Sequence, residues 1–288
     1  MRRLTDPRIL YITSMVVFGT IGLFVRNITV PSGELAMYRA VLASVMLSGY
    51  LAASRQKIPF RKIGRELPLL LISGVAMGFN WILLFEAYKY TTISVATISY
   101  YFAPVIVTLV SPVLFKEKTG AKQWICFFMS TLGIILIIKP GGLSEGGKNL
   151  IGILFGLGAA CLYACVILLN KLIRQVEGIH RTFLQFLAAV IVLFPYVALT
   201  GGFTVSSLDR KGLILLLIVG FIHTGVAYCL YFSSLKELPG QKAAILSYID
   251  PLVAVFASVL FLGERMTLLQ AAGGCLILGF TLWNEIGS

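Results

Sequence analysis

The chain has 288 residues, of which 58% are hydrophobic and 12% are charged, and its formal net charge is +12. Soluble domains are usually about 25% charged, so this composition excludes a soluble globular protein and predicts an integral membrane protein. The positive charge does not predict nucleic-acid binding, because the basic residues stand in short segments between apolar runs, where they act as a membrane topology signal.

Ten apolar runs follow one another along the chain. A bilayer core about 30 Å thick needs about 20 helical residues to cross it, and runs this continuously apolar are typical of helices rather than of alternating barrel strands. The sequence therefore predicts an all-α integral membrane protein with ten transmembrane helices. The predicted spans are residues 9–26, 34–53, 67–88, 91–115, 121–138, 150–170, 182–200, 211–233, 240–262 and 267–284.

The first apolar run and the cysteines further restrict the kind of membrane protein that the sequence predicts. The first run has no small-residue cleavage site after a short core, so we expect a retained span rather than a signal peptide. Five cysteines all lie inside apolar runs and form no Cys-x-x-Cys pair. Buried free cysteine behaves as a small hydrophobic residue, so we expect no disulfide framework, no metal site and no other cofactor.

An internal repeat links the fourth and ninth spans. Pro104 and Glu117 recur as Pro251 and Glu264, and the members of each pair lie 147 positions apart. A tyrosine stands three residues before each of the two prolines. A shared register of Tyr, Pro and Glu is hard to obtain from apolar composition alone, so we interpret it as a duplication. These residues serve as structural anchors of the repeat.

Each half contains five predicted spans, an odd number, so the second copy would cross the membrane in the opposite sense to the first. We expect a first repeat at residues 1–140, a Gly-rich linker at 141–148 and a second, inverted repeat at 149–288. The loops carry sixteen Lys and Arg on the side of the two termini and seven on the other side. The positive-inside rule then predicts a multi-pass protein of the cytoplasmic membrane with both termini in the cytoplasm.

Together these features resemble the EamA-type permeases of the drug/metabolite transporter superfamily, which include bacterial ten-helix exporters of amino acids and metabolites. The ten spans in two repeats, the Tyr-x-x-Pro-x12-Glu segments, the Phe18-Gly19-Thr20 turn and Arg39 carry the resemblance. It implies a central cavity, with the spans at 121–138 and 267–284 on the periphery. Phe18 departs from the family pattern, which usually has Trp at the start of the first span.

Asp250 is the first candidate for the transport site. It lies within the ninth span, directly before Pro251, where the helix loses a backbone hydrogen bond. An ionisable residue inside a span is costly and suggests a function. Proton coupling or substrate contact is one interpretation, and a polar contact that stabilises the helix is the other.

Two further ionisable residues lie within spans. His223 could relay a proton together with Asp250, since histidine titrates near physiological pH, or it could be a hydrogen-bonded packing residue. Arg39 could bind a carboxylate or phosphate of the substrate, or it could pair with Glu34 or Glu86. We expect the ion pair slightly more than the substrate contact.

An aromatic and amide lining is also predicted for the cavity. Such groups suit an organic cation or an aromatic amino acid through stacking and cation–π contact, although Trp and Tyr near span ends can instead anchor a helix at the membrane interface. The candidates for the lining are Asn80, Trp81, Tyr88, Tyr100, Tyr101, Tyr163 and Tyr248, and Tyr228 is a further site candidate on the same span as His223.

The sequence as a whole predicts a secondary transporter that moves a small polar metabolite by alternating access, with export of amino acids or related compounds expected first. Organic cations, drugs or phosphorylated metabolites are alternatives in the same fold, and a non-transporting receptor or scaffold is the alternative of another class. The chain has no phosphate-binding GxxxxGK[ST] loop and no HExxH or GxSxG motif, so we expect neither ATP-driven pumping nor catalysis. The expected partners are the substrate, the bilayer and, as one alternative, protons, with no nucleic acid, and the chain is expected to be a monomer or weak dimer.

Overall fold

The computed structural model describes residues 6–55, 60–116, 120–138, 147–176 and 178–286, and these residues form helices and turns without a strand. The all-α prediction is therefore confirmed for the described part of the chain. The helices are α1 (Pro7–Val25), α2 (Ser32–Ala53), α3 (Phe60–Tyr90), α4 (Ile93–Tyr100), α5 (Ala103–Phe115), α6 (Ala121–Ile138), α7 (Lys148–Leu172), α8 (Gly178–Thr200), η1 (Val205–Ser207), α9 (Arg210–Leu217), η2 (Ile218–Val226), α10 (Ala227–Leu235), α11 (Gly240–Ser247), α12 (Ile249–Leu262) and α13 (Leu268–Glu285).

Within the described ranges, nine helical segments are long and apolar enough to cross a membrane. They correspond to the first nine predicted spans, with α4 and α5 counted together and α9, η2 and α10 counted together. The tenth predicted span is also a helix, α13, with 18 residues. This helix carries the polar residues Gln270, Asn284 and Glu285 at its ends. It is not among the nine segments that are long and apolar enough to cross a membrane.

Both Tyr-x-x-Pro segments interrupt a helix. In the first, α4 ends at Tyr100 and α5 begins at Ala103, directly before Pro104. In the second, α11 ends at Ser247 and α12 begins at Ile249, two residues before Pro251. Proline has no N–H and its ring disfavours a helical conformation in the residue before it. The predicted spans 91–115 and 240–262 are therefore not single uninterrupted helices.

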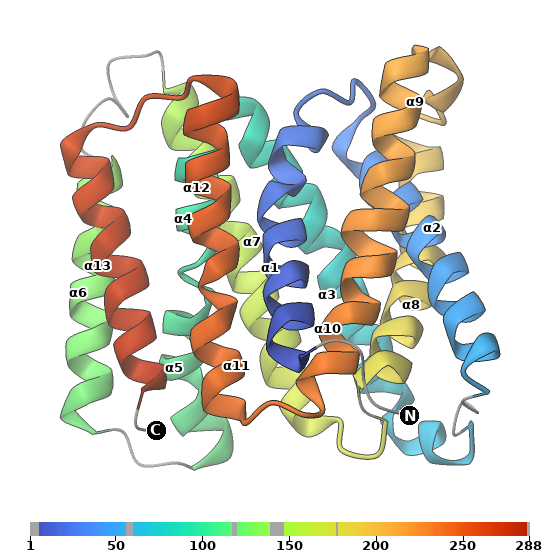
Figure 1. Ribbon diagram of the computed structural model, residues 1–288, viewed down its shortest axis with the longest axis horizontal. Helices are drawn as coiled ribbons and strands as arrows, with labels where there is room; N and C mark the ends of the chain where they lie inside the picture. Colours follow the sequence, from blue (N-terminus) through green and yellow to red (C-terminus); the bar gives the residue numbers. More distant parts are fainter. Residues whose placement is uncertain (1–5, 56–59, 117–119, 139–146, 177, 287–288) are drawn as a thin grey trace.

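The helices form one bundle, with α6 and α13 as a pair at one edge (Figure 1). The central helix α3 packs against α7 and α8, while α1 packs against α12 and α10, and α2 packs against α8 and η2. The largest buried cluster draws on all of these helices except α12. A smaller cluster around Ile98, Ile137 and Ile277 joins α6 and α13 to α4 and α7. Arg39, His223 and Asp250 lie on helices of the main bundle, namely α2, η2 and α12.

The edge pair is antiparallel and closely packed. Lys122, near the start of α6, donates hydrogen bonds to the carbonyl oxygens of Asn284 and Ile286 at the end of α13, at 3.1 and 2.5 Å. Gly133 and Gly273 meet where the helices cross. A Cβ atom added at Gly273 would lie 2.5 Å from the carbonyl oxygen of Gly133, and one added at Gly133 would lie 2.7 Å from that of Gly273. Backbone contact of this kind needs glycine at both positions.

Gly273→Ala tests this contact. The added methyl group meets a backbone oxygen that cannot rotate away, so we expect a loss of about 1–3 kcal/mol, typical of overpacking. Gly279→Ala is the matched control, because Gly279 lies in the same helix with no atom within 4 Å of an added Cβ. Thermal unfolding of the purified protein in detergent should show a lower melting temperature for the first variant alone. Equal melting temperatures for the two variants would contradict the packing described.

Candidate functional site

Arg39 lies in the centre of the bundle, on α2, with 5% of its surface exposed. Its Nε donates a hydrogen bond of 2.7 Å to the hydroxyl oxygen of Thr224, on η2. Its guanidinium lies over the ring of Trp81, on α3, at 4.3 Å from the ring centroid. Two of the sequence candidates, Arg39 and Trp81, are therefore brought together. Thr224 was not predicted as a partner of the arginine.

The expected ion pair of Arg39 with Glu34 or Glu86 is wrong. Glu34 accepts hydrogen bonds from the backbone N–H groups of Thr204 and Val205, both at 2.8 Å, and also from the Thr204 hydroxyl. Glu86 pairs with Lys89 on its own helix. Both glutamates lie near helix ends, where these local partners satisfy them. Among the described residues, no carboxylate forms an ion pair with Arg39.

Asp250 is the second residue of α12, and its Oδ2 accepts a hydrogen bond of 2.7 Å from the hydroxyl of Tyr101. Tyr101 stands at the interruption between α4 and α5, so the bond joins the two helix breaks. The polar contact proposed as one interpretation of Asp250 is thus present. Among the described residues, the other carboxylate oxygen, Oδ1, makes no hydrogen bond. Proton coupling and substrate contact at Asp250 stay predictions.

Within the described residues, Arg39 and Asp250 do not form an ion pair with each other. The bundle therefore contains one basic and one acidic side chain that contact different aromatic residues, Trp81 and Tyr101. Opposite charges held apart in this way can interact with a polar solute that carries charges of its own.

Two rows of aromatic rings begin at these two contacts, one at Tyr101 and one at Trp81. One row contains Tyr163 stacked on Tyr100 at 5.2 Å, with Tyr101 next to Tyr100 at 6.0 Å. Tyr248 extends it at 6.5 Å from Tyr101. Tyr163 keeps 38% of its surface exposed, whereas Tyr248 is buried. The first row thus combines four tyrosines, all of which were predicted from the sequence as lining candidates.

The second row runs from Trp81 through Phe186 to Tyr228, with centroid distances of 5.3 Å at both steps. Phe18 meets Tyr228 edge-on at 5.0 Å. Phe18 therefore contributes an aromatic contact from α1, at the position where the family pattern usually has Trp.

His223 lies on η2 next to Thr224 but contacts other residues. Its Nε2 is 3.2 Å from the hydroxyl oxygen of Thr20 on α1, and its Nδ1 is 3.4 Å from the carbonyl oxygen of Ile218. It makes no hydrogen bond to Asp250, so the predicted relay has no direct link in this structure. In the described part of the chain, no three His, Cys, Asp or Glu side chains gather as metal ligands would.

Asn80 has a contact that ties helices together. Its side-chain amide donates a hydrogen bond of 2.6 Å to the carbonyl oxygen of Ala159, which joins α3 to α7. It is buried, with 1% of its surface exposed. The structure thus shows a helix-packing contact for Asn80, and its place in the cavity lining stays a prediction.

Glu264 contacts the first half of the chain. It forms an ion pair with Arg26 at the end of α1 and accepts hydrogen bonds from the backbone N–H groups of Ile93 and Ser94, at 2.9 and 3.3 Å. These N–H groups begin α4 and have no partner within the helix, and a carboxylate at this end is favoured by the helix dipole. The repeat anchor thus caps a helix of the other half. The corresponding Glu117 lies outside the described residues.

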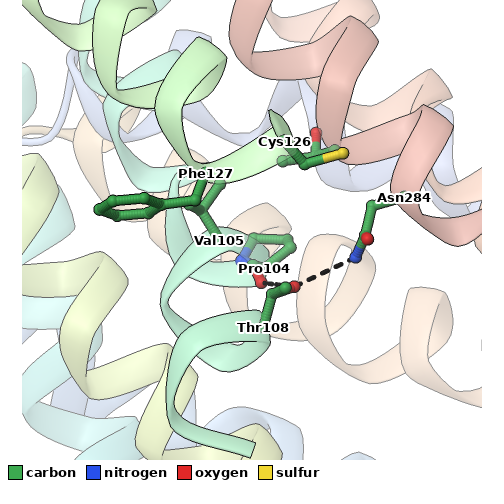
Figure 2. Close-up of a pocket in the computed structure, with 7 residues that line it drawn as sticks. Pro104, Val105, Thr108, Cys126, Phe127 and Asn284 are labelled. Carbon is green, nitrogen blue, oxygen red and sulfur yellow. Dashed lines mark hydrogen bonds between the residues drawn. The ribbon is translucent and has the colours of Figure 1, made fainter. Parts of the chain in front are cut away.

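A small cavity of about 10 Å³ lies beside Pro104 (Figure 2). Figure 2 shows Thr108 between two partners: its hydroxyl donates to the carbonyl oxygen of Pro104 at 2.9 Å and accepts from the amide of Asn284 at 3.1 Å. This volume holds one water molecule at most. The cavity is too small for a metabolite, so it is not the transport site. It is lined by Pro104, Val105, Thr108, Cys126, Phe127, Thr281 and Asn284.

A model of the EamA-like transporter family matches the chain twice, at residues 8–139 and 150–284. An uncharacterized transporter of Bacillus subtilis, YxxF, is 32% identical over 263 residues, which cover 91% of this chain and 84% of the relative. An uncharacterized transporter of Archaeoglobus fulgidus is 30% identical over 282 residues, which cover 95% of each chain.

Two further similarities bear on substrate and fold. A Salmonella typhimurium protein with the name "Probable amino-acid metabolite efflux pump" is 25% identical over 185 residues, 60% of this chain and 61% of that protein. A solved crystal structure superposes with a TM-score of 0.67 at 16% identity, covering 96% of this chain and 95% of the other. At this identity the superposition shows a shared fold alone.

Glu264→Ala tests the cap on α4. The substitution leaves two N–H groups of a buried helix start without an acceptor, so we expect a loss of about 2–4 kcal/mol. Glu86→Ala is the control: it removes the exposed pair with Lys89 and should cost about 0–1 kcal/mol. Unfolding of both variants in detergent, followed by circular dichroism, measures the difference. A cost for Glu264→Ala as small as that of the control would show that the cap contributes little.

Proposed function

The chain belongs to the EamA-like transporter family of the drug/metabolite transporter superfamily, and on that premise we propose that it is a secondary transporter that works by alternating access. It is a multi-pass membrane protein. The proposed cargo is a small polar metabolite that crosses the cytoplasmic membrane, with amino acids or related compounds as the first candidates and export as the direction.

One observation carries this proposal: the hydrogen bonds of both central charges cross between the halves of the chain. Arg39 belongs to the first half and bonds to Thr224 in the second. Asp250 belongs to the second half and accepts from Tyr101 in the first. Charges within a membrane protein are expensive and typically mark the substrate or ion pathway. In transporters built from inverted repeats, the substrate binds near the midplane between the repeats, which is where these bonds would lie.

The packing supports ten membrane helices in two inverted repeats, with α13 as the tenth. The family match falls once in each half. The antiparallel contact of α6 with α13 is what two inverted copies of a fifth helix would make. The beginning of α1 and the end of α13 lie at the same end of the bundle (Figure 1), in keeping with two termini in the cytoplasm.

A correspondence between side chains adds to this support. The offset of 147 positions relates Arg39 to Phe186 and Trp81 to Tyr228. The guanidinium of Arg39 lies over Trp81, and the ring of Phe186 meets Tyr228. The same two positions thus pack against each other in both halves. A two-fold relation of this kind makes inward-open and outward-open forms nearly equivalent, as alternating access needs.

Amino acids suit this site because they carry both a carboxylate and an ammonium group, and the bundle contains one basic and one acidic side chain, Arg39 and Asp250. The relative with an efflux-pump name supports the same class. Organic cations and phosphorylated metabolites are the competing substrates. A receptor or scaffold of the same fold would bind a ligand without moving it, so transport across a membrane separates that class from a carrier.

The inverted arrangement predicts where single cysteines react. Ser54, after α2, and Gly201, after α8, are related by the 147-residue offset, and both are exposed. In a background without the five native cysteines, we expect Ser54→Cys to react with a membrane-impermeant maleimide only from the cytoplasmic side and Gly201→Cys only from the outside. Labelling of both from one side of intact cells and inverted vesicles would refute the inverted repeat.

Transport in liposomes tests the function and the role of Asp250. Vesicles containing the purified protein should move radiolabelled amino acids faster than empty vesicles, and an imposed pH gradient should accelerate the movement. Asp250→Asn removes the ionisable group while it keeps the shape of the side chain, so we expect loss of the acceleration with normal folding. Asp209→Asn is the control, because Asp209 caps α9 and asparagine caps a helix equally well. Unchanged pH dependence in Asp250→Asn would exclude proton coupling at this residue.

A further inference from the structure

The guanidinium of Arg39 is under-satisfied compared with the buried carboxylates of the protein. An arginine side chain offers five N–H donors, and within the described residues Arg39 uses one, from Nε to Thr224. Glu66, in contrast, accepts from three successive backbone N–H groups, those of residues 174 to 176. Glu34 and Glu264 are likewise held by backbone N–H groups. Arg39 thus keeps N–H donors that have no hydrogen-bond acceptor among the described residues.

The contacts of Arg39 fix the orientation of its guanidinium. Thr224 accepts from Nε and donates its own hydroxyl hydrogen to the carbonyl oxygen of Val219 at 2.9 Å. Trp81 covers one face at 4.3 Å, and Phe85 lies at 5.7 Å. One edge and one face of the planar group are occupied. The edge formed by the two terminal nitrogens is the fork that binds a carboxylate or phosphate through two parallel hydrogen bonds.

The backbone of η2 brings Thr224 to this place. η2 is a π-helix, and the Thr224 hydroxyl bonds to the carbonyl five residues earlier. π-helical turns are rare and are frequent at functional sites. Gly220 and Gly225 lie on either side of Thr224 and pack directly on α2, where a Cβ added at Gly225 would lie 2.6 Å from Met46 and one added at Gly220 would overlap Leu42. The two glycines allow η2 close enough to α2 for Thr224 to reach Arg39.

The fold does not require a charge at this position. The residue related to Arg39 by the repeat offset is Phe186, which is fully buried and packs against Tyr228 as Arg39 packs against Trp81. A planar apolar ring therefore satisfies the same packing. An unpaired buried cation is strongly unfavourable, so the arginine needs a reason other than packing.

We propose that Arg39 binds the oxyanion of the transported solute, a carboxylate or a phosphate, and that Thr224 is the positioning residue that presents its guanidinium. The proposal rests on the proposed transport function and narrows it, because it excludes organic cations that carry no oxyanion. The solute completes the hydrogen bonds of Arg39 when it binds.

Matched solute pairs test the proposal on the full-length protein in detergent. L-phenylalanine and phenethylamine differ by a carboxylate, and phosphoethanolamine and ethanolamine differ by a phosphate. A ligand that binds the folded form alone raises its melting temperature. We expect the wild-type protein to be stabilised by the oxyanion-bearing member of at least one pair and not by its partner. The pair that responds identifies carboxylate or phosphate as the recognised group.

Variants of Arg39 and Thr224 test whether the stabilisation by oxyanion solutes depends on these two residues. Arg39→Phe places at position 39 the ring that the other half has at Phe186, where it packs against Tyr228. We therefore expect this variant to fold and to show no rise in melting temperature with the oxyanion solutes. Thr224→Val should weaken binding by about tenfold to a hundredfold, the effect of a lost hydrogen bond to a charged group, and Thr224→Ser should restore it. A purely structural role for Thr224 would lower the melting temperature without ligand and leave the affinity unchanged.

Three results would overturn the inference: stabilisation by the amines as strong as that by the acids, no response to either oxyanion, or full binding by Arg39→Phe. Flux measured with the same solutes in liposomes keeps the two conclusions separate. Movement of the amines alone would refute oxyanion recognition and leave the transporter intact. Binding of an oxyanion without movement of any solute would support the site and refute transport.

Discussion

A charge inside a lipid-embedded bundle must find its hydrogen-bond partners within the protein, because lipid supplies none. Much of this structure follows from that constraint. Glu34, Glu66 and Glu264 satisfy it by accepting backbone N–H groups at the starts of helices and loops. These N–H groups themselves lack a partner within a helix, so each contact removes two unsatisfied groups at once. The carboxylates therefore hold segments that are distant in sequence.

Arg39 and Asp250 meet the constraint differently, because each bonds to a side chain and not to backbone N–H groups. Arg39 and Asp250 each bond to a side chain of the opposite half, through Thr224 and Tyr101. A side-chain bond between two bodies can break when they move apart and re-form when they return, whereas a carboxylate that caps a helix must stay in place. The two halves thus contact each other through side-chain bonds at Arg39 and Asp250 and through carboxylate-to-backbone bonds at Glu34, Glu66 and Glu264.

The sequence predicts the helices well and the polar contacts poorly. Apolar runs are local signals, so the spans follow from them. The interruptions inside the predicted spans 91–115 and 240–262 were not predicted, although each lies next to a proline, Pro104 or Pro251. The partner of Arg39 could not be predicted, because Glu34 and Glu86 lie at suitable positions along the chain while Thr224 is 185 residues away. The π-helix η2 also leaves no signal, since Ile218–Val226 appears only as one more apolar run.

The sequence marked Glu264 as a repeated residue but did not show which residues it contacts. Its recurrence after a fixed interval suggested an anchor of the repeat, but the residues it anchors, at the start of α4, belong to the other half. A repeat in sequence identifies equivalent positions within each copy. It carries no information about contacts between copies, which depend on how the copies are oriented in space.

The repeat also shows how a symmetric scaffold can hold an asymmetric site. Arg39 and Phe186 occupy equivalent positions and pack on Trp81 and Tyr228, which are themselves equivalent. A guanidinium and a phenyl ring are both flat and both pack well on an aromatic face. Exchange of one for the other therefore preserves the packing of the duplicated fold. Asp250 is likewise a charge that occurs in one half, since its equivalent is Ala103. In the transport mechanism that we propose, rocking between two similar states would depend on the shared packing, and recognition of a solute on the charges that occur once.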